Sequence, residues 1–256
     1  MTRALITNDD GIDSPGLHAL ALAAIAHGLD VVVAAPARQS SGSSASITAA
    51  EDDGRIQIDR RELPGLAGVP AFAVRGAPGL IALIASNGAF GDAPDLVLSG
   101  INHGANVGRA ILHSGTVGAA LTGGLGGARG LAVSLDVGMS PDVFEWDAAA
   151  RVTREVLPIL LAEAPGTVVN LNVPNVSSPV ELREATLAPF GIVQTTMHRD
   201  GDHHVRLAVE DLPNDPVPGS DAALLAEGYA TLTSITPVSA VPLRAPVAPA
   251  VEPVET

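Results

Sequence analysis

The 256-residue sequence has no cysteine and no lysine, since all 14 of its basic residues are arginine. These absences exclude a thiolate nucleophile, a cysteine metal site, a Schiff-base lysine and a phosphate-binding P-loop lysine. The lack of disulfides fits a cytoplasmic protein, which is the location we expect. The first residues contain no long apolar segment typical of a secretory signal, and no apolar run approaches the length of a membrane span.

Positive charge and aromatic side chains are also scarce. The 14 basic residues face 28 acidic ones, which gives a formal net charge of -14. We therefore expect neither a nucleic-acid polymer nor an anionic membrane as a partner, and an anionic substrate would need a cation recruited locally. One tryptophan and one tyrosine are too few for a base-stacking platform, so nucleobase recognition should be loose.

Short apolar segments alternate with longer helical ones along most of the chain. This alternation predicts a doubly wound α/β fold with a mainly parallel sheet. We expect buried strands at residues 4–7, 30–36, 95–100, 130–136 and 166–174, and helices at 14–27, 78–85, 115–127 and 147–164. Residues 46–59 read as a hairpin or extended excursion around the turn "DDG".

Two C-terminal segments do not follow the alternation. Residues 190–212 resemble two strands around the turn "RDGD", a hairpin that would leave the main body and meet a partner subunit. Residues 239–256 are proline-rich, which disfavours both a central strand and a helix, and predict a mobile tail. The rest, residues 1–238, is expected to form a single domain.

Three polar loops follow predicted strands, and in an open α/β sheet ligands bind beyond the carboxyl ends of the strands. Their sequences are "TNDDG", "PARQSSGSSAS" and "SGINHGANVG". They could bring Asp9, Asp10, a serine hydroxyl and an asparagine carbonyl together. Such hard oxygen ligands suit Mg²⁺, Mn²⁺ or Ca²⁺, and a cation would relieve the repulsion between the aspartates. The alternative is a solvated turn in which one aspartate caps the next helix.

The segment "HSGTVGAA" follows the third loop and places Ser114, Gly115 and Thr116 at a predicted helix N-terminus. Free backbone N–H groups there attract an anion such as phosphate, although ordinary capping by Ser114 or Thr116 is the simpler alternative. A metal beside an anion site suggests hydrolysis of phosphate esters. The sequence has no G-x-G-x-x-G after its first strand and no G-x-S-x-G, which argues against dinucleotide binding and a serine hydrolase.

Six segments together resemble the SurE family of stationary-phase survival proteins, which are metal-dependent nucleotidases. They are "ITNDDGIDSPG", "APARQSSGSSASIT", "PDLVLSGINHGANVG", "HSGTVGAA", "VVNLNVP" and "GYATLTSITP", in the family's order between residues 3 and 237. The resemblance implies a three-layer Rossmann-like fold, one divalent metal per subunit, and release of phosphate from nucleoside 5′- or 3′-monophosphates and, in some members, short polyphosphate. It also implies exchange of C-terminal elements between subunits, hence a homodimer or homotetramer.

The resemblance also implies roles for particular residues. The family's metal ligands fall on Asp9, Asp10, Ser41 and Asn102, with Mg²⁺ or Mn²⁺ as the expected metal; the spacing after "AP" favours Ser41 over Ser40. The expected substrate- or phosphate-binding residues are Asn8, Asn106, Ser114, Gly115 and Thr116. Asp9 and Asp10 are the candidate catalytic groups, and either could act as general base or as nucleophile.

The chain departs from the family pattern at four positions. A usual threonine and a usual aspartate are replaced by Ala77 and Leu80, a usual glutamate by Thr122, and a proline by Arg129. None is an expected metal ligand, so the chemistry should survive. The alternative function is a noncatalytic metal- or nucleotide-binding protein that keeps the fold.

Overall fold

The computed structural model describes residues 1–49, 51–52, 54–138, 142–189, 193–200, 204–211, 217–236 and 238–239. Within them a nine-stranded sheet has the order β10-β13-β9-β8-β7-β1-β2-β6-β5. Its strands are β1 Arg3–Thr7, β2 Asp30–Pro36, β5 Ile58–Arg61, β6 Ala71–Val74, β7 Leu96–His103, β8 Arg129–Asp136, β9 Val168–Pro174, β10 Leu182–Glu184 and β13 Ala230–Ile235. The α-helices are α1 Pro15–Ala26, α2 Pro78–Ser86, α3 Gly115–Leu125, α4 Trp146–Ala162 and α5 Asp221–Ala226, and the 3₁₀ helix η1 spans Gly108–His113.

Six neighbouring strands, from β9 through β8, β7, β1 and β2 to β6, run parallel. Successive residues of a strand face opposite sides of the sheet, and both sides are covered here. Ala4 and Ile6 of β1 pack into the cluster that contains Leu17 of α1 and Val156 of α4. Leu5, between them, packs against the α2–α3 side. The nearly continuous apolar runs of these strands follow from this double burial.

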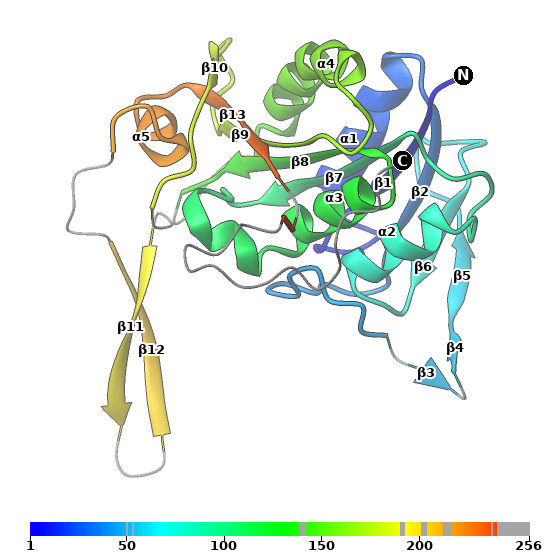
Figure 1. Cartoon of the computed structure of the whole chain (residues 1–256), viewed down its shortest axis with the longest axis horizontal. Helices are drawn as coiled ribbons and strands as arrows, with labels where there is room; N and C mark the ends of the chain where they lie inside the picture. The colour runs from blue at the N-terminus through cyan, green and yellow to red at the C-terminus, as the bar shows by residue number, and fades with distance from the viewer. Residues whose placement is uncertain are drawn as a thin grey trace, which may run out of the picture.

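Helices α1 and α4 therefore cover one face, and α2 and α3 the other (Figure 1). Helix α1 starts where the sequence predicts, because Ser14 caps it and Pro15 needs no hydrogen-bond partner at the first helical position. Helix α4 continues through Pro158, whose side of the helix is exposed. The predicted three-layer, mainly parallel α/β fold is confirmed.

Each edge of the sheet carries a reversed strand. At one edge β5 pairs antiparallel with β6; near the other, β13 pairs antiparallel with β9 and parallel with β10. The alternation in the sequence did not predict β6, β10, β13 or α5, because these elements are short. The sheet thus extends on both sides beyond the strands read from the sequence.

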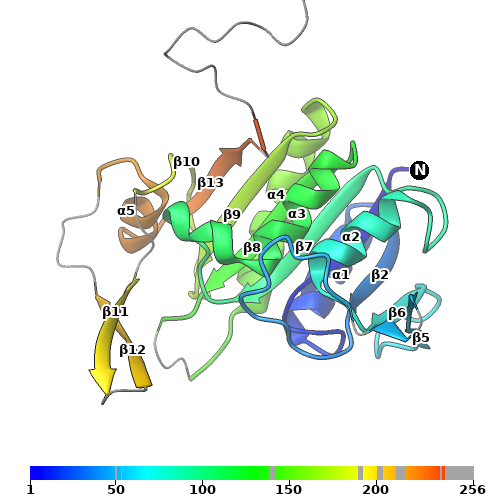
Figure 2. The same cartoon turned by 60° about the horizontal axis from the view of Figure 1, so that its bottom comes forward.

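Two hairpins lie outside the nine-stranded sheet. Strands β3 Glu51–Asp52 and β4 Arg55–Ile56 pair antiparallel, as expected around "DDG". Strands β11 Val193–Asp200 and β12 His204–Asp211 form a second antiparallel pair that projects from the rest of the molecule (Figure 2). This confirms the protruding hairpin, while its exchange between subunits stays a prediction. Residues 240–256 of the expected tail lie outside the described part of the chain.

None of the helices in the described part of the chain combines the length and the apolar character that crossing a bilayer requires.

Candidate active site

The loop after β1 carries Asp9 and Asp10 at the carboxyl end of the central strand. Asp9 is buried, with 5% of its surface exposed, and its Oδ1 accepts a hydrogen bond of 2.6 Å from the Thr116 hydroxyl of α3. Its carbonyl accepts a bond of 2.7 Å from the Ser40 amide. Asp9 therefore joins the first polar loop to the second loop and to the start of α3.

Asp10 joins the same loop to two others. Its Oδ2 accepts from the backbone amide of His103 at 3.3 Å. The side-chain nitrogen of Gln39 lies 3.5 Å from Asp10 Oδ1 and 3.0 Å from Ser41 Oγ, so one amide bridges the two oxygens. Ser41 is thus connected to Asp10 through Gln39.

Both aspartates sit in surroundings that disfavour their charge. Burial raises the pKa of the Asp9 carboxyl above its ordinary value; the hydrogen bond from the Thr116 hydroxyl opposes this rise, and the charge of Asp10 adds to it. Burial likewise raises the pKa of Asp10, against the hydrogen bond from the His103 amide. Within the described residues no arginine forms a salt bridge with either carboxylate. A bound cation would favour the charged forms.

Asn102 lies near the end of β7, where the pairing with β8 shifts register between Ser99 and Asn102. Such an irregularity re-aims the side chains that follow it. The side-chain nitrogen of Asn102 donates to the Gly104 carbonyl at 2.7 Å. Its Oδ1, which has no hydrogen bond within the described residues, is an oxygen suited to a hard cation.

Asn8 is fully buried and braces the acidic turn. Its side chain donates to the Gly11 carbonyl and accepts from the Gly11 amide, both at 3.1 Å. This pair of bonds closes the turn across Asp9 and Asp10. A direct contact between Asn8 and substrate stays a prediction.

The N-terminus of α3 faces the acidic pair. Ser114 caps the helix, since its Oγ accepts from the Val117 amide at 3.1 Å. Gly115 comes next, and a Cβ there would lie 2.5 Å from Ser43 Oγ and 2.8 Å from Asp9 Oδ2. Only glycine fits without displacing these oxygens. The first amides of a helix have no partner within it, so this end can receive an anion.

Asn106 is held by four hydrogen bonds. Its amide donates to Asn172 Oδ1 at 2.8 Å, and its carbonyl accepts from Asn170 and Asn172 at 2.8 and 2.9 Å. Its side-chain nitrogen donates to Ser134 Oγ at 2.8 Å. The two asparagines and the serine are fully buried on β9 and β8. Strands β8 and β9 therefore fix the position of Asn106.

The segment beyond Asn106 is anchored by Asp221, a fully buried residue that the sequence reading missed. Its carboxylate accepts from the amides of Gly108, Ala188 and Ala222 at 2.8, 2.9 and 2.8 Å. Ser220 and Asp221 opening a short apolar helix are a capping signal that could have been noticed. The contact with Gly108, 113 residues away, had no signal in the sequence.

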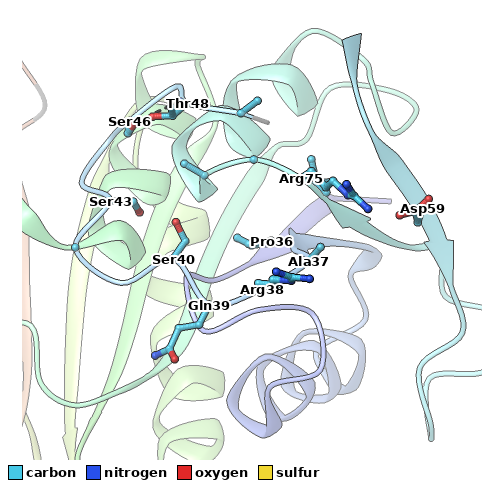
Figure 3. A pocket seen from close by; sticks show the side chains of 15 residues that line it. Pro36, Ala37, Arg38, Gln39, Ser40, Ser43, Ser46, Thr48, Asp59 and Arg75 are labelled. Atoms are coloured by element: carbon cyan, nitrogen blue, oxygen red, sulfur yellow. Dashed lines mark hydrogen bonds between the residues drawn. The ribbon is translucent and has the colours of Figure 1, made fainter. Parts of the chain in front are cut away.

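A cleft of about 870 Å³ opens along the second polar loop. It lies between residues 36–49 on one side and residues 74–77 with Asp59 on the other. Figure 3 shows the hydroxyls of Ser40 and Ser43 toward one end and the guanidinium groups of Arg38 and Arg75 toward the other. The sequence reading did not consider these arginines.

Hydrogen bonds connect the three polar loops and the start of α3, while the roles of the predicted site residues stay predictions. Thr116 bonds Asp9, Gln39 links Asp10 to Ser41, and a Cβ at Gly115 would meet Asp9. Within the described residues no three histidine, cysteine or acidic side chains are grouped to hold a metal. A cation here would therefore need the two carboxylates together with serine and asparagine oxygens, a donor set that suits a hard divalent ion.

The departures from the family pattern have structural consequences away from the acidic pair. Ala77 is the N-cap of α2 and provides no capping hydrogen bond, which a threonine would supply. Leu80 is buried, Thr122 donates to the Gly118 carbonyl, and Arg129 donates to the Glu163 carbonyl. Helix ends and packing are affected, while the expected ligands are retained.

Comparisons with known proteins show which family the fold and the sequence resemble. The model of the family described as Survival protein SurE matches residues 4–197. The chain is 35% identical over 243 residues to 5′-nucleotidase SurE 1 of Burkholderia lata, covering 91% of this chain and 90% of that protein. It is 38% identical over 247 residues to 5′-nucleotidase SurE of Symbiobacterium thermophilum, covering 93% and 92%. The crystal structure of SurE protein from Aquifex aeolicus superposes with a TM-score of 0.73 at 27% identity, covering 91% and 93%.

Proposed function

Because the chain belongs to the SurE family of survival proteins, we propose that it is a nucleotidase that releases phosphate from nucleoside 5′- or 3′-monophosphates. Relatives whose alignments cover almost the whole chain are called 5′-nucleotidases. The observation that carries the proposal is the acidic pair, buried Asp9 and half-buried Asp10, at the N-terminus of α3. Short polyphosphate is a further candidate substrate.

The donor set fits one divalent cation per subunit, Mg²⁺ or Mn²⁺, held by Asp9, Asp10, Ser41 and Asn102. The raised pKa values of both carboxylates support this assignment. When bound, such a cation polarises phosphoryl oxygens and lowers the pKa of water. Asp9 or Asp10 then serves as general base or as nucleophile.

The phosphate is proposed to lie at the start of α3. The amides of Gly115 and Thr116 would donate to its oxygens, and the missing Cβ of Gly115 leaves room for close approach. Thr116 holds Asp9 through its hydroxyl. Asn106, fixed by its buried partners, would donate a second side-chain hydrogen to the phosphate. These fixed donors need little rearrangement as charge develops.

Two further expectations concern the assembly and its location. The projecting β11–β12 hairpin offers a backbone edge for pairing with a second copy, in a homodimer or homotetramer. The cytoplasm is the proposed location, as the absence of cysteine suggests. Residues 1–238 are proposed to act as one domain.

The proposal is tested by measuring phosphate release from a panel of nucleoside 5′- and 3′-monophosphates and polyphosphate, with Mg²⁺ or Mn²⁺ and then with EDTA. We expect turnover that EDTA abolishes. Asp9→Asn should lower metal-dependent turnover by at least about 100-fold while the folded state persists. Tight nucleotide binding without turnover would instead support the noncatalytic alternative, and unchanged turnover in Asp9→Asn would refute the role of Asp9.

A further inference from the structure

The cleft along the second loop begins at the proposed phosphate position. Ser43 lines the cleft, and its Oγ is buried without a hydrogen-bond partner in the described part of the chain. The same oxygen lies 2.5 Å from the place of a Cβ on Gly115. A phosphate at the start of α3 would therefore lie at one end of this cleft, and the rest of its molecule could occupy the cleft itself.

The other end of the cleft carries two cationic side chains, those of Arg38 and Arg75. Arg38 and Arg75 are both exposed, and the structure gives neither a hydrogen bond from its guanidinium group nor an ion pair within the described residues. Several other arginines are neutralised: Arg3 by Asp30 at 3.1 Å, Arg61 by Asp13 at 2.8 Å and Arg183 by Glu181 at 3.0 Å.

One carboxylate also lines this end of the cleft. Asp59 accepts two bonds of 3.1 Å from the side-chain amide of Gln57, and it forms no salt bridge with either arginine. Two guanidinium groups against one carboxylate leave local positive charge, in a protein whose formal net charge is -14. Guanidinium groups match phosphate oxygens in geometry as well as in charge.

We propose that this cleft binds the body of the substrate and that Arg38 and Arg75 bind a second phosphate group on it. The ligand class is a nucleoside bisphosphate, in which one phosphate reaches the start of α3 and the other reaches the arginines. The inference rests on the proposed nucleotidase function and narrows its substrate. A volume of about 870 Å³ suits a ligand of this size.

The reaction consumes one water per phosphate released. The water oxygen forms a bond to the phosphorus at α3, and the bond between that phosphorus and the ribose oxygen breaks. One proton of the water passes to the ribose oxygen, which leaves as a hydroxyl, and the other remains with the released phosphate or the solvent. The second phosphate is unchanged and serves only for binding.

The test compares adenosine 5′-monophosphate with adenosine 3′,5′-bisphosphate as substrates of the full-length protein with Mg²⁺ or Mn²⁺. The wild-type protein should have the higher kcat/KM for the bisphosphate. In the double variant Arg38→Gln/Arg75→Gln, the ratio of bisphosphate to monophosphate kcat/KM should fall at least about tenfold, because charge-assisted hydrogen bonds are lost. Arg154→Gln, which removes an exposed arginine of α4 on the opposite face of the sheet, should keep the wild-type ratio.

Each other outcome has a definite meaning. If the wild-type protein hydrolyses the monophosphate but does not prefer the bisphosphate, or if the double variant keeps the ratio, the second phosphate site is overturned while the nucleotidase function stands. If neither substrate is hydrolysed, the proposed function fails. The cleft is then tested by calorimetric titration with adenosine 3′,5′-bisphosphate: binding that the double variant loses supports the site, and no binding overturns it.

Discussion

The acidic turn and the surroundings of Asn106 lie along the same edge of the sheet, yet they are built in opposite ways. Asn106 makes four hydrogen bonds to buried uncharged partners. Asp9 and Asp10 are two carboxylates whose pKa values burial raises, with no arginine in a salt bridge to either among the described residues. The Asn106 region is held by neutral groups alone, whereas the acidic turn would gain stability from a cation.

This difference in construction suggests that the Asn106 region positions a side chain, while the acidic turn carries out chemistry. Neutral hydrogen bonds that are satisfied in the fold make a rigid support at small net cost. A buried carboxylate next to a half-buried one costs folding free energy, and such sites persist when function requires them. The Asn106 region therefore holds a donor in place, and the acidic turn is the proposed reaction centre.

Among variants that keep both carboxylates, the largest expected effect comes from filling the space beside Asp9. Gly115→Ala would place a methyl group 2.5 Å from Ser43 Oγ and 2.8 Å from Asp9 Oδ2. We expect kcat/KM for a nucleoside monophosphate to fall about 100-fold, because displacement of reacting groups by fractions of an ångström is costly. Steady-state phosphate release measures this.

Gly126→Ala is the matched control at the other end of α3. Its Cβ would also lie 2.5 Å from a serine oxygen, that of Ser86, but far from the acidic turn. This variant should lose about 1–3 kcal/mol of stability through overpacking and keep its turnover. Equal losses of activity in the two variants would contradict a phosphate position at Gly115.

A smaller effect is expected from Asn172→Ala, which removes two of the four bonds to Asn106. We expect a loss of about 1–3 kcal/mol in the free energy of unfolding and about tenfold in kcat/KM. Asn175→Ala is the control, because the Asn175 side chain also makes two hydrogen bonds to backbone groups. It accepts from the Glu145 amide and donates to the Val143 carbonyl. Denaturant unfolding measures the loss of stability, and initial rates measure the loss of kcat/KM. Equal losses of activity in the two variants would show that Asn172 has no special positioning role.

The smallest effect concerns the stability cost of the acidic turn. Since the pKa of Asp9 is raised in the folded state, the folded protein binds more protons than the unfolded one between the ordinary and the raised pKa. Stability should fall as the pH rises through this window. Asp9→Asn removes this cost, and its Oδ1 can still accept from Thr116.

In EDTA, the Tm of Asp9→Asn should therefore exceed that of the wild-type protein above the raised pKa, and the difference should vanish below the ordinary aspartate range. Thermal unfolding at a series of pH values measures it. With saturating Mn²⁺ the order should reverse, because the cation stabilises only the protein that binds it. A Tm difference independent of pH would show that Asp9 carries no such cost.

Most of the central fold could be predicted from local patterns. The helix start at Ser14 and Pro15, the strand Asp30–Pro36 and the helix that passes through Pro158 all appear where the sequence placed them. Long apolar segments bounded by capping residues carry this information locally. Strand β13 was missed because its sequence, ATLTSI, lacks the continuous apolar run that marked β1, and helix α5 because six residues are too few to show a helical period.

The residues of the candidate site also divide into those that the sequence predicted and those that it did not. Asp9, Asp10 and the start of α3 were proposed because they follow predicted strands or begin a helix. Asp221 was not, because its role depends on the amide of Gly108, 113 residues away. The cleft with Arg38 and Arg75 was not found either, since it forms only where two separate segments face each other.

The sequence by itself determined the alternation of strands and helices, the acidic turn after the first strand and the lack of thiol and lysine chemistry, because each is a property of neighbouring residues or of composition. Only the tertiary structure decided that Thr116 bonds Asp9, that Asn172 holds Asn106 and that Arg38 and Arg75 share a cleft. Such contacts join residues distant in the chain. They exist only once the sheet has fixed the positions of its loops.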